Sequence, residues 1–337
     1  MKAWILYGPR DLRLEDRELN IDQLQPDELY VETDYSALST GTDRGNYEGA
    51  ERVPGAPDYP RWVGYNNAGT VIAVGSAVTR FKPGDRVFTM KPHQSAFIIK
   101  QTENIVRIPD GVPSESASMT YLYHLGFHAL HTGEYVPGEN VAVVGTGILG
   151  LTTISLARVF GARVVALSNS EYRMEFARKV GAHRAFMSDD PNLEQKLLEF
   201  TDGAGIDLVV LAANPWPAYR AAVEAVRKGG RLSILSLPGR GEKDLDFNPL
   251  ALKWTYAKSL TIKIVSGLPA YPYPLPDGSP RFSVVRGCEY LLHLMEDGAI
   301  RPADLITHRL SYQQAKDAYE MAFGRDKSMV GVVFKWK

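Results

Sequence analysis

The chain has 337 residues, of which 45% are hydrophobic and 23% charged, so it can bury a sizeable core and is expected to form two domains. Its 38 basic and 39 acidic residues give a formal net charge of −1, and the sequence contains no basic run of the kind that binds nucleic acid or an anionic membrane. These values favour a small-molecule substrate as the partner and argue against nucleic acid and membrane surfaces.

Two local features of the sequence bear on the cellular compartment of the protein. The apolar stretch at the N-terminus ends at Gly8-Pro9 and charged residues follow, so neither a secretory signal nor a membrane span is predicted. The only cysteine, Cys288, excludes a disulfide within the chain, and its helical apolar context favours simple core packing. A cytoplasmic location is the default expectation.

Residues 1–115 are predicted to form a mainly β domain. Short runs rich in β-branched and aromatic residues alternate there with turns that contain Gly and Pro, which is typical of strands. The runs lie at residues 29–35, 69–76, 85–90 and 95–100.

From residue 116 to 268 the pattern changes to apolar strands that alternate with helical segments. Strand patterns lie at residues 141–145, 163–168, 207–212 and 231–237, and helical patterns at residues 148–161, 171–181, 193–200 and 217–230. Such alternation is typical of a parallel sheet wrapped by helices. The predicted fold class is therefore α/β, with a doubly wound Rossmann sheet as the second domain.

Residues 269–337 are predicted to return to the first domain and complete it. Residues 259–267 have a strand pattern, and residues 268–282 form a long segment rich in Pro, Gly and Tyr. After it come two helical patterns and a final strand at residues 329–337. Tyr271 and Tyr273 of the long segment could cover a ring-bearing substrate, or the segment could cover a partner subunit.

The first motif that indicates a function consists of three glycines. Gly145, Gly147 and Gly150 have the G-x-G-x-x-G spacing directly after an apolar strand and at the start of a helical pattern. The first glycine permits a tight turn, the second lets the backbone approach a pyrophosphate, and the third permits close helix packing. The helix start at Ile148 and Leu149 offers N–H groups to the anion. A dinucleotide cofactor is therefore predicted.

The next strand ends without the carboxylate that an NAD-selective site presents to the ribose. Ser168, Asn169 and Ser170 stand there instead, followed by Arg173. Hydroxyl and amide donors with a guanidinium would stabilise a 2′-phosphate through charge-assisted hydrogen bonds. This pattern predicts NADP(H) in preference to NAD(H); alternatively, Arg173 is a solvated helix residue and either cofactor binds.

Two further strand ends are expected to open onto the cofactor crevice, because ligands bind at the carboxyl ends of strands in such sheets. Backbone groups there are expected to hold the nicotinamide. The residues are Ala213, Asn214, Ser236 and Leu237.

Two strings resemble the medium-chain dehydrogenase/reductase superfamily. GTVIAVGSAVTRFKPGDRV at residues 69–87 is similar to a characteristic stretch of its first domain, and residues 136–166 are similar to its entry into the cofactor domain. The resemblance extends over nearly the whole chain. It implies a mainly β, GroES-like catalytic domain beside the Rossmann domain, and it implies oxidoreductase activity with a nicotinamide cofactor.

Zinc-using members of this superfamily carry a Cys-Gly-Thr-Asp-like string, a Gly-His-Glu string and a further Cys or Asp ligand. Here Thr40 stands in place of the first cysteine, Gly64-Tyr65-Asn66 replaces the second string, and Tyr121 falls near the third ligand. Hydroxyl and phenol groups are poor zinc ligands, and one cysteine cannot build a four-cysteine structural site. No zinc is therefore expected. The strings LSTGTD and VGY also resemble a zinc-lacking branch that includes bacteriochlorophyllide hydroxyethyl-group dehydrogenases, within a threonine dehydrogenase-like group.

Without a metal, side-chain donors must stabilise the charge that develops on the substrate oxygen. The family positions around the metal site hold Thr40, Thr42, Tyr65 and Tyr121. The leading hypothesis makes Tyr65 the main hydrogen-bond donor or acid, with Thr42 and Tyr121 assisting. Alternatively, the two tyrosines only fill the space of the former ligands.

Other polar residues nearby are expected to be structural. Asp43 is expected to bind backbone in its glycine-rich loop. Each of His93, His124 and His128 is expected to be a satisfied structural histidine before a catalytic one, and no metal is assigned to them.

The sequence therefore leaves two possible functions open. The first is an NADP(H)-dependent oxidoreductase acting on a carbonyl, an alcohol or an activated carbon–carbon double bond. The second is a cofactor-binding regulatory or structural protein without turnover, which the lack of one unmistakable catalytic acid would suit. A homodimer is expected, since the strand pattern at residues 259–267 resembles the edge strand through which this superfamily commonly dimerises.

Overall fold

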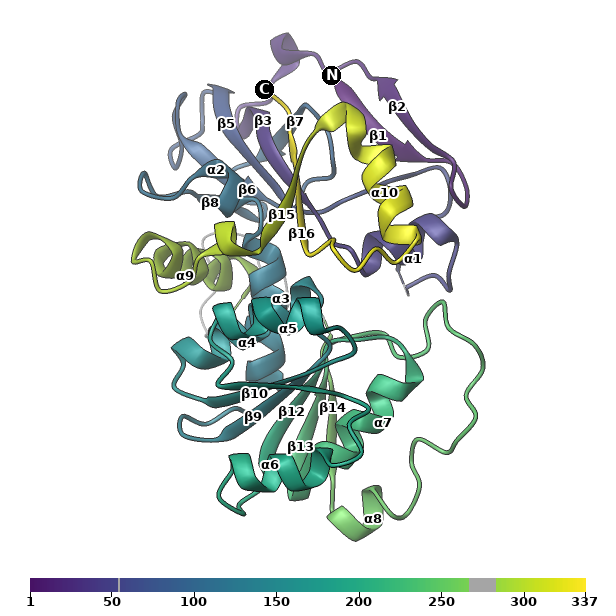
Figure 1. Cartoon of the computed structure of the whole chain (residues 1–337). Helices are drawn as coiled ribbons and strands as arrows, with labels where there is room; N and C mark the ends of the chain where they lie inside the picture. Colours follow the sequence, from purple (N-terminus) through teal and green to yellow (C-terminus); the bar gives the residue numbers. More distant parts are fainter. Residues whose placement is uncertain (54, 267–282) are drawn as a thin grey trace. The chain divides into compact units, whose positions relative to one another are not determined.

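The computed structural model describes residues 1–53, 55–266 and 283–337 (Figure 1). Tyr271 and Tyr273 lie outside these residues. The chain divides into two compact units, one of Met1–His124 with Leu268–Lys337 and one of Leu125–Gly267. The first boundary between the two units falls inside helix α3 (Thr120–Thr132), whereas the sequence pattern placed this boundary near residue 115.

The first unit is built on a seven-stranded sheet, mostly antiparallel, with the order β15-β16-β3-β5-β6-β8 and with β7 paired to β3. A second sheet has the order β2-β1-β4. The strands are β1 (Lys2–Leu6), β2 (Leu12–Asp16), β3 (Glu28–Leu38), β4 (Arg61–Trp62), β5 (Asn67–Val74), β6 (Arg86–Thr89), β7 (Ala96–Lys100), β8 (Ile105–Arg107), β15 (Ile306–Ser311) and β16 (Gly331–Lys335). This is the mainly β unit that the sequence predicted.

Helices and short 3-10 turns surround these sheets. They are η1 (Ile21–Gln23), α1 (Thr42–Glu48), α2 (Ser114–Ala117), α9 (Val284–Glu296), η2 (Pro302–Leu305), η3 (Tyr312–Gln314) and α10 (Ala315–Phe323). The amphipathic α10 buries Ala315, Ala318, Tyr319 and Ala322 against a core that also holds Tyr47 and Phe334, because apolar residues at i, i+3, i+4 and i+7 share one helix face.

The C-terminal segment completes the main sheet. β16 pairs antiparallel with β3, Val332 lying opposite Leu38, and β15 pairs parallel with β16. β15 was not predicted from the sequence. Its residues ITHRLS contain only two apolar side chains, and the strand lies at the end of the sheet order where one side is exposed.

The second unit is a six-stranded parallel sheet with the order β11-β10-β9-β12-β13-β14, which is the 3-2-1-4-5-6 order of a doubly wound dinucleotide-binding fold. The central strands are almost completely buried, as expected when helices cover both faces. The strands are β9 (Asn140–Val144), β10 (Arg163–Ser168), β11 (Arg184–Met187), β12 (Ile206–Leu211), β13 (Val226–Ile234) and β14 (Thr261–Ile264). The helices are α4 (Ile148–Val159), α5 (Glu171–Lys179), α6 (Leu193–Phe200), α7 (Trp216–Ala225) and α8 (Thr255–Lys258).

One helix ends earlier than its sequence pattern indicated. The pattern predicted a helix through residue 230, but α7 ends at Ala225 and β13 starts at Val226. The Lys258 ammonium donates hydrogen bonds to the carbonyls of Val223, Glu224 and Val226, which satisfies acceptors left open by the helix end. A distant lysine therefore fixes this boundary.

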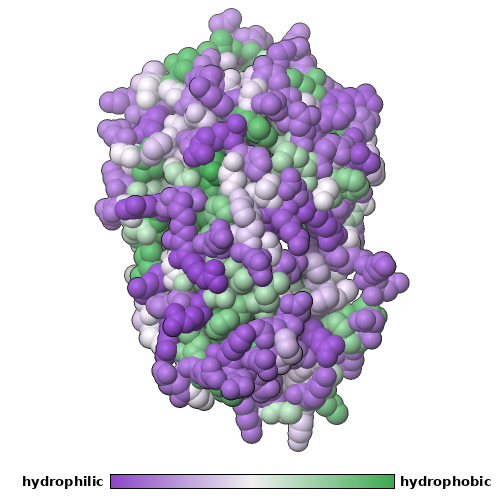
Figure 2. All heavy atoms as spheres, in the orientation of Figure 1, coloured by the Kyte–Doolittle hydropathy of each residue, from purple (hydrophilic) through white to green (hydrophobic). Residues whose placement is uncertain are grey.

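Hydrophilic side chains dominate the face of the molecule shown in Figure 2. In the part of the chain that the structure describes, no helix combines the length and the apolar character needed to cross a bilayer.

Candidate functional site

The glycine turn between β9 and α4 has the geometry of a dinucleotide-binding loop. Gly145 has φ +98°, and a Cβ there would lie 2.6 Å from the Ala213 Cβ at the end of β12. A Cβ on Gly150 would lie 1.8 Å from the Gly145 carbonyl oxygen. At Gly147 a Cβ would meet nothing within 4 Å, so the space that this glycine leaves is open for a ligand.

The turn also offers hydrogen-bond donors. Gly147 is the N-cap of α4 and no side chain caps the helix, so backbone N–H groups of the first turn are directed at an incoming anion. Ile148 is buried and Leu149 is half-buried. β9 and β12 lie side by side although β10 and β11 intervene in the sequence, and ligands bind at such a topological switch point.

The residues predicted to select the cofactor lie together after β10. The Ser168 hydroxyl is buried, lies 2.5 Å from the Thr146 hydroxyl and accepts a hydrogen bond from the Ser170 N–H. Ser170 caps α5 through the N–H of Arg173. Asn169 is exposed and Arg173 is half-buried. The two serines therefore shape the turn, while the side chains of Asn169 and Arg173 reach its surface.

The strand ends at residues 213–214 and 236–237 are joined directly. The Asn214 side-chain oxygen accepts a hydrogen bond from the Leu237 N–H at 3.1 Å, and the Asn214 carbonyl accepts one from Gly239 at 2.8 Å. The Ser236 hydroxyl oxygen is buried without a hydrogen-bond partner among the described residues. Ala213 contacts the turn at Gly145. The residues that the sequence predicted to bind the cofactor thus lie within the second unit.

In the first unit, Asp43 organises the loop that carries the other candidates. Its buried carboxylate accepts hydrogen bonds from the N–H groups of Ser39 (2.9 Å) and Gly64 (3.3 Å), and the Tyr319 hydroxyl lies beside it. This agrees with the structural role expected for Asp43. The bond to Gly64 joins α1 to the segment before β5 and thereby fixes the backbone at Tyr65.

Tyr65, Thr42 and Tyr121 come together in this unit. The rings of Tyr65 and Tyr121 meet edge to face with centroids 5.7 Å apart, an arrangement that aromatic pairs prefer. The hydroxyls of Thr42 and Ser39 lie beside the Tyr65 phenol. Thr40 lies half-buried in the turn after β3.

The environment of the two tyrosines keeps both phenols neutral. Burial raises the pKa of Tyr65 well above its usual value, and the negative charge of Asp43 adds to this, although Ser39 and Thr42 oppose it. Burial also raises the pKa of Tyr121 to about 12. A phenol held in the protonated form can donate a hydrogen bond to an oxygen that gains negative charge.

The three histidines singled out from the sequence have structural contacts. His93 is completely buried, its Nδ1 lies 2.8 Å from the Ser36 hydroxyl, and its ring packs against Phe334. The His124 ring stacks on Tyr121 with centroids 5.2 Å apart. In the second unit, the His128 Nε2 donates to the Ser266 carbonyl.

Acid destabilisation through His93 is a first prediction. Burial lowers the pKa of His93 to about 3, whereas a histidine in an unfolded chain titrates near about 6.5. The unfolded state therefore binds the proton first, and stability present above pH 6.5 is lost as the pH falls toward 3. The free energy of unfolding should drop by about 1.4 kcal/mol per pH unit from this group.

Urea unfolding at pH 7.5 and at pH 5 measures this effect. The wild type should lose more stability between the two pH values than the His93→Gln variant does. His293→Gln, which changes an exposed histidine, serves as the control and should behave as the wild type. Equal losses in wild type and His93→Gln would contradict the assignment.

The residues in place of the metal ligands do not fit zinc. Hydroxyl and phenol groups stand at Thr40 and Tyr65, and Tyr121 lies nearby. The Asn66 amide, which is completely buried, has no hydrogen-bond partner among the described residues, but amide oxygens suit harder cations. Nowhere in residues 1–53, 55–266 and 283–337 do three His, Cys, Asp or Glu side chains form a metal-binding group.

Three contributors to the site were missed in the sequence. Ser39 stands three residues before Thr42 in a hydroxyl-rich string, which could have suggested it. Thr146 occupies the variable place between two glycines of the turn, and its bond to Ser168 had no local signal. Tyr319 lies almost three hundred residues from Asp43 along the chain, so only the fold reveals their contact.

The chain matches two family models. The alcohol dehydrogenase GroES-like domain matches residues 25–136, and the zinc-binding dehydrogenase family matches residues 149–264. Among curated relatives, sorbitol dehydrogenase of Bacillus subtilis is 25% identical over 96% of this chain and 93% of its own length. L-threonine 3-dehydrogenase of Anaeromyxobacter is 28% identical over 73% of this chain and 85% of its own length.

Solved structures share the fold. A Sinorhizobium meliloti protein assigned to the zinc-binding dehydrogenases, with NADP bound, has a TM-score of 0.78 at 20% identity, covering 99% of this chain and 98% of that one. An alcohol dehydrogenase of Escherichia coli CFT073, complexed with NADH, has a TM-score of 0.78 at 19% identity, covering 99% of both chains. The chain belongs to the medium-chain dehydrogenase/reductase superfamily of alcohol dehydrogenase-like oxidoreductases.

Proposed function

We propose that this protein is a zinc-independent, NADP(H)-dependent oxidoreductase that transfers a hydride to or from a small carbonyl or alcohol, or an activated carbon–carbon double bond. The observation that carries the proposal is the contact between the Tyr65 and Tyr121 rings, with the Thr42 hydroxyl beside the Tyr65 phenol. By the sequence resemblance, these residues stand at or near the positions of the metal site in zinc-using members of the superfamily. The sorbitol dehydrogenase and the L-threonine 3-dehydrogenase among the relatives support alcohol or ketone chemistry.

The nicotinamide, when bound, supplies or accepts the hydride. The protein then has to bind the dinucleotide and stabilise charge on the substrate oxygen. The glycine turn at residues 145–150 would hold the pyrophosphate with backbone N–H groups. Tyr65 would donate a hydrogen bond to the substrate oxygen, and Asp43 would hold the Tyr65 segment in place through Gly64. Thr40 would contribute a further hydroxyl at the edge of this cluster.

A turnover assay tests the function. NADPH consumption is measured with ketones, sugar-derived carbonyls, enones and quinones, and NADP⁺ reduction with secondary alcohols and polyols. Turnover of at least one class is expected. Tight NADPH binding without turnover of any class would favour the alternative of a cofactor-binding regulatory protein.

Zinc independence is tested separately by metal analysis of protein prepared without chelators. Less than about a tenth of an equivalent of zinc is expected, because four-coordinate zinc sites use Cys, His and carboxylate ligands that are not grouped in the described residues. Stoichiometric zinc that is lost together with activity on dialysis against a chelator would overturn this part of the proposal.

The cofactor preference rests on the turn after β10. Asn169 and Arg173 lie there, and no carboxylate follows β10 directly. The wild type should bind NADPH more tightly than NADH. Arg173→Gln should weaken NADPH binding about tenfold, because a charge-assisted hydrogen bond is lost, and should leave NADH binding unchanged.

Calorimetric titration with both cofactors measures these affinities. Arg178→Gln, an exposed change on the same helix α5, is the matched control and should alter neither. Tighter binding of NADH than of NADPH by the wild type would contradict the preference.

A homodimer is also proposed. β14 lies at the end of the parallel sheet and pairs with β13, and Ile264 on it is 64% exposed. An exposed edge strand with an apolar side chain is a ready surface for pairing with a second copy. Sedimentation velocity should show a dimer, and a monomer at micromolar concentration would exclude it.

A further inference from the structure

The backbone just before Tyr65 rests on the ring of a histidine. Gly64 has φ +80°, and a Cβ added there would lie 2.5 Å from the His93 Nε2 and Cδ2 atoms. The His93 N–H also donates a hydrogen bond to the Val63 carbonyl at 2.8 Å. The imidazole therefore packs against Gly64 more closely than a residue with a side chain would permit, and its position limits where the Tyr65 segment can lie.

His93 in turn is held by the main sheet of the first unit. It is completely buried, and its Nδ1 lies 2.8 Å from the Ser36 hydroxyl on β3. Its ring meets the Phe334 ring on β16 edge to face, with centroids 5.1 Å apart. Ser36 and Phe334 lie directly opposite each other across the β16–β3 pair, so both contacts come from one face of this sheet. The β16–β3 register thus fixes the imidazole.

Ser36 is held by Trp336, which follows β16. The Trp336 indole N–H donates to the Ser36 hydroxyl at 2.9 Å, and the proton of that hydroxyl is then available for the His93 Nδ1. Burial lowers the pKa of His93 to about 3, so the ring is neutral and can accept this proton in a hydrogen bond. One continuous series of contacts therefore leads from Trp336 to the ring that packs against Gly64.

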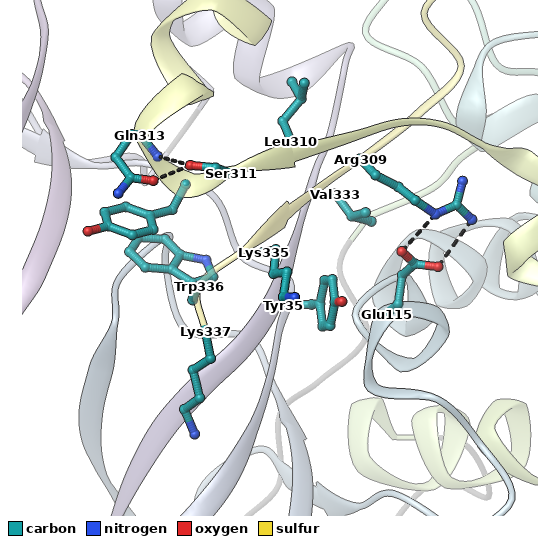
Figure 3. A pocket seen from close by; sticks show the side chains of 11 residues that line it. Tyr35, Glu115, Arg309, Leu310, Ser311, Gln313, Val333, Lys335, Trp336 and Lys337 are labelled. Atoms are coloured by element: carbon teal, nitrogen blue, oxygen red, sulfur yellow. Dashed lines mark hydrogen bonds and ion pairs between the residues drawn. The ribbon is translucent and has the colours of Figure 1, made fainter.

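Trp336 is itself firmly placed. Its side chain is buried, and its ring stacks on Tyr312 with centroids 4.8 Å apart. Its N–H donates to the Asp34 carbonyl at 3.0 Å, which continues the pairing of β16 with β3. Because side chains alternate along a strand, Trp336 lies on the opposite face of the sheet from Lys335, its neighbour in Figure 3. The series of contacts thus starts from a side chain with little freedom to move.

We propose that Trp336 is a positioning residue for Tyr65, which it holds in place through this series of contacts. Asp43 fixes Gly64 by accepting its N–H at 3.3 Å, and the His93 ring supports the same glycine by direct packing. A hydrogen-bond donor stabilises developing charge only when it is placed accurately. Trp336 has this role in catalysis only if Tyr65 is the donor proposed above.

Trp336→Phe removes the indole N–H and keeps a ring that can stack on Tyr312. Turnover should fall about tenfold, since a misplacement of about 1 Å can cost up to about a hundredfold. The KM for substrate and the NADPH affinity should stay unchanged, because the phenol acts on charge that develops in the transition state. Ser36→Ala should give the same loss, and the double variant should lose no more, because both substitutions interrupt one series of contacts. Steady-state kinetics and calorimetric titration measure these effects.

Trp4→Phe is the matched control. Trp4 lies in the same hydrophobic core as Trp336, and its indole N–H donates to the Tyr312 carbonyl at 2.9 Å, so this substitution also removes one indole hydrogen bond. The Trp4 backbone N–H, which the substitution keeps, donates to the His93 carbonyl. Thermal unfolding should show similar losses of stability for both variants, but Trp4→Phe should keep full turnover. Equal turnover of the two variants would overturn the proposal, and Ser36→Ala gives an independent result should Trp336→Phe fail to fold.

Fluorine NMR tests the placement of Tyr65 without turnover. 3-Fluorotyrosine is incorporated at position 65 alone, and spectra are recorded in the absence of substrate. The signal should shift in Trp336→Phe and in Ser36→Ala, and it should stay in place in Trp4→Phe. An unshifted signal in the first two variants, when folded, would overturn the proposal whether or not the protein turns over a substrate. Shifted signals together with full turnover of Tyr65→Phe would instead refute the donor role of Tyr65, and with it the catalytic role of Trp336.

Discussion

Replacing Gly147 by alanine is expected to weaken NADPH binding by about tenfold to a hundredfold while leaving the folded protein as stable as the wild type. The backbone at Gly147 has φ −73° and ψ −178°, which alanine adopts without strain. A Cβ there meets no protein atom within 4 Å, so the fold tolerates it. The methyl group would instead occupy the space where a pyrophosphate contacts the backbone, at the cost of its charge-assisted hydrogen bonds.

Gly150 provides the matched control for this change. A Cβ at Gly150 would lie 1.8 Å from the Gly145 carbonyl oxygen, so Gly150→Ala must force α4 away from β9 and should lower the melting temperature markedly. Thermal unfolding and calorimetric NADPH titration, applied to both variants, separate the two roles. A well-folded Gly147→Ala protein that binds NADPH as tightly as the wild type would show that no cofactor phosphate rests at this turn.

The contrast between these glycines shows what local sequence can establish. The spacing of Gly145, Gly147 and Gly150 after an apolar strand predicted the turn, because the strand, the turn and the helix start are neighbours in the chain. The parallel sheet followed from the same periodicity, and its strand order was found as that fold requires. Local patterns therefore sufficed for the strand, the turn and the helix that are proposed to hold the cofactor.

The candidate catalytic residues of the first unit come together through contacts between segments that are distant in the sequence. The family resemblance placed Thr42, Tyr65 and Tyr121 near one another, and the structure brings these three together. It could not show that Ser36 bridges His93 and Trp336. Contacts between residues so far apart in the sequence depend on the strand register and on the return of the C-terminal segment to the main sheet of the first unit. Neither leaves a pattern in the local sequence.

The pairing of Tyr35 with Lys335 was missed for the same reason. Tyr35 and Lys335 lie three hundred residues apart in the chain and become neighbours only through the β16–β3 register. β15, which supplies Arg309, has a weak strand pattern. Contacts that involve an unpredicted edge strand cannot be predicted from the spacing of residues in the sequence.

The largest catalytic effect is expected for Tyr65→Phe, which should lower turnover about a hundredfold and change the KM for substrate little. The phenol is the donor proposed for the substrate oxygen, and the loss of one such donor costs about this factor in other enzymes. Because burial raises its pKa well above the usual value, the phenol stays protonated from pH 6 to pH 9. The Tyr65-dependent part of the turnover should therefore be flat over this range.

Steady-state kinetics of wild type and variant from pH 6 to pH 9 measure both effects. Thr42→Val, which removes a hydroxyl beside the phenol, should give a smaller loss in the same direction. Tyr135→Phe, which removes a tyrosine hydroxyl bonded to the Phe160 carbonyl in the second unit, should leave turnover unchanged. A Tyr65→Phe enzyme with full turnover would mean that Tyr65 and Tyr121 only fill the space of former metal ligands, and the oxygen-directed donor would then have to be sought among the remaining hydroxyls of Ser39, Thr40 and Thr42.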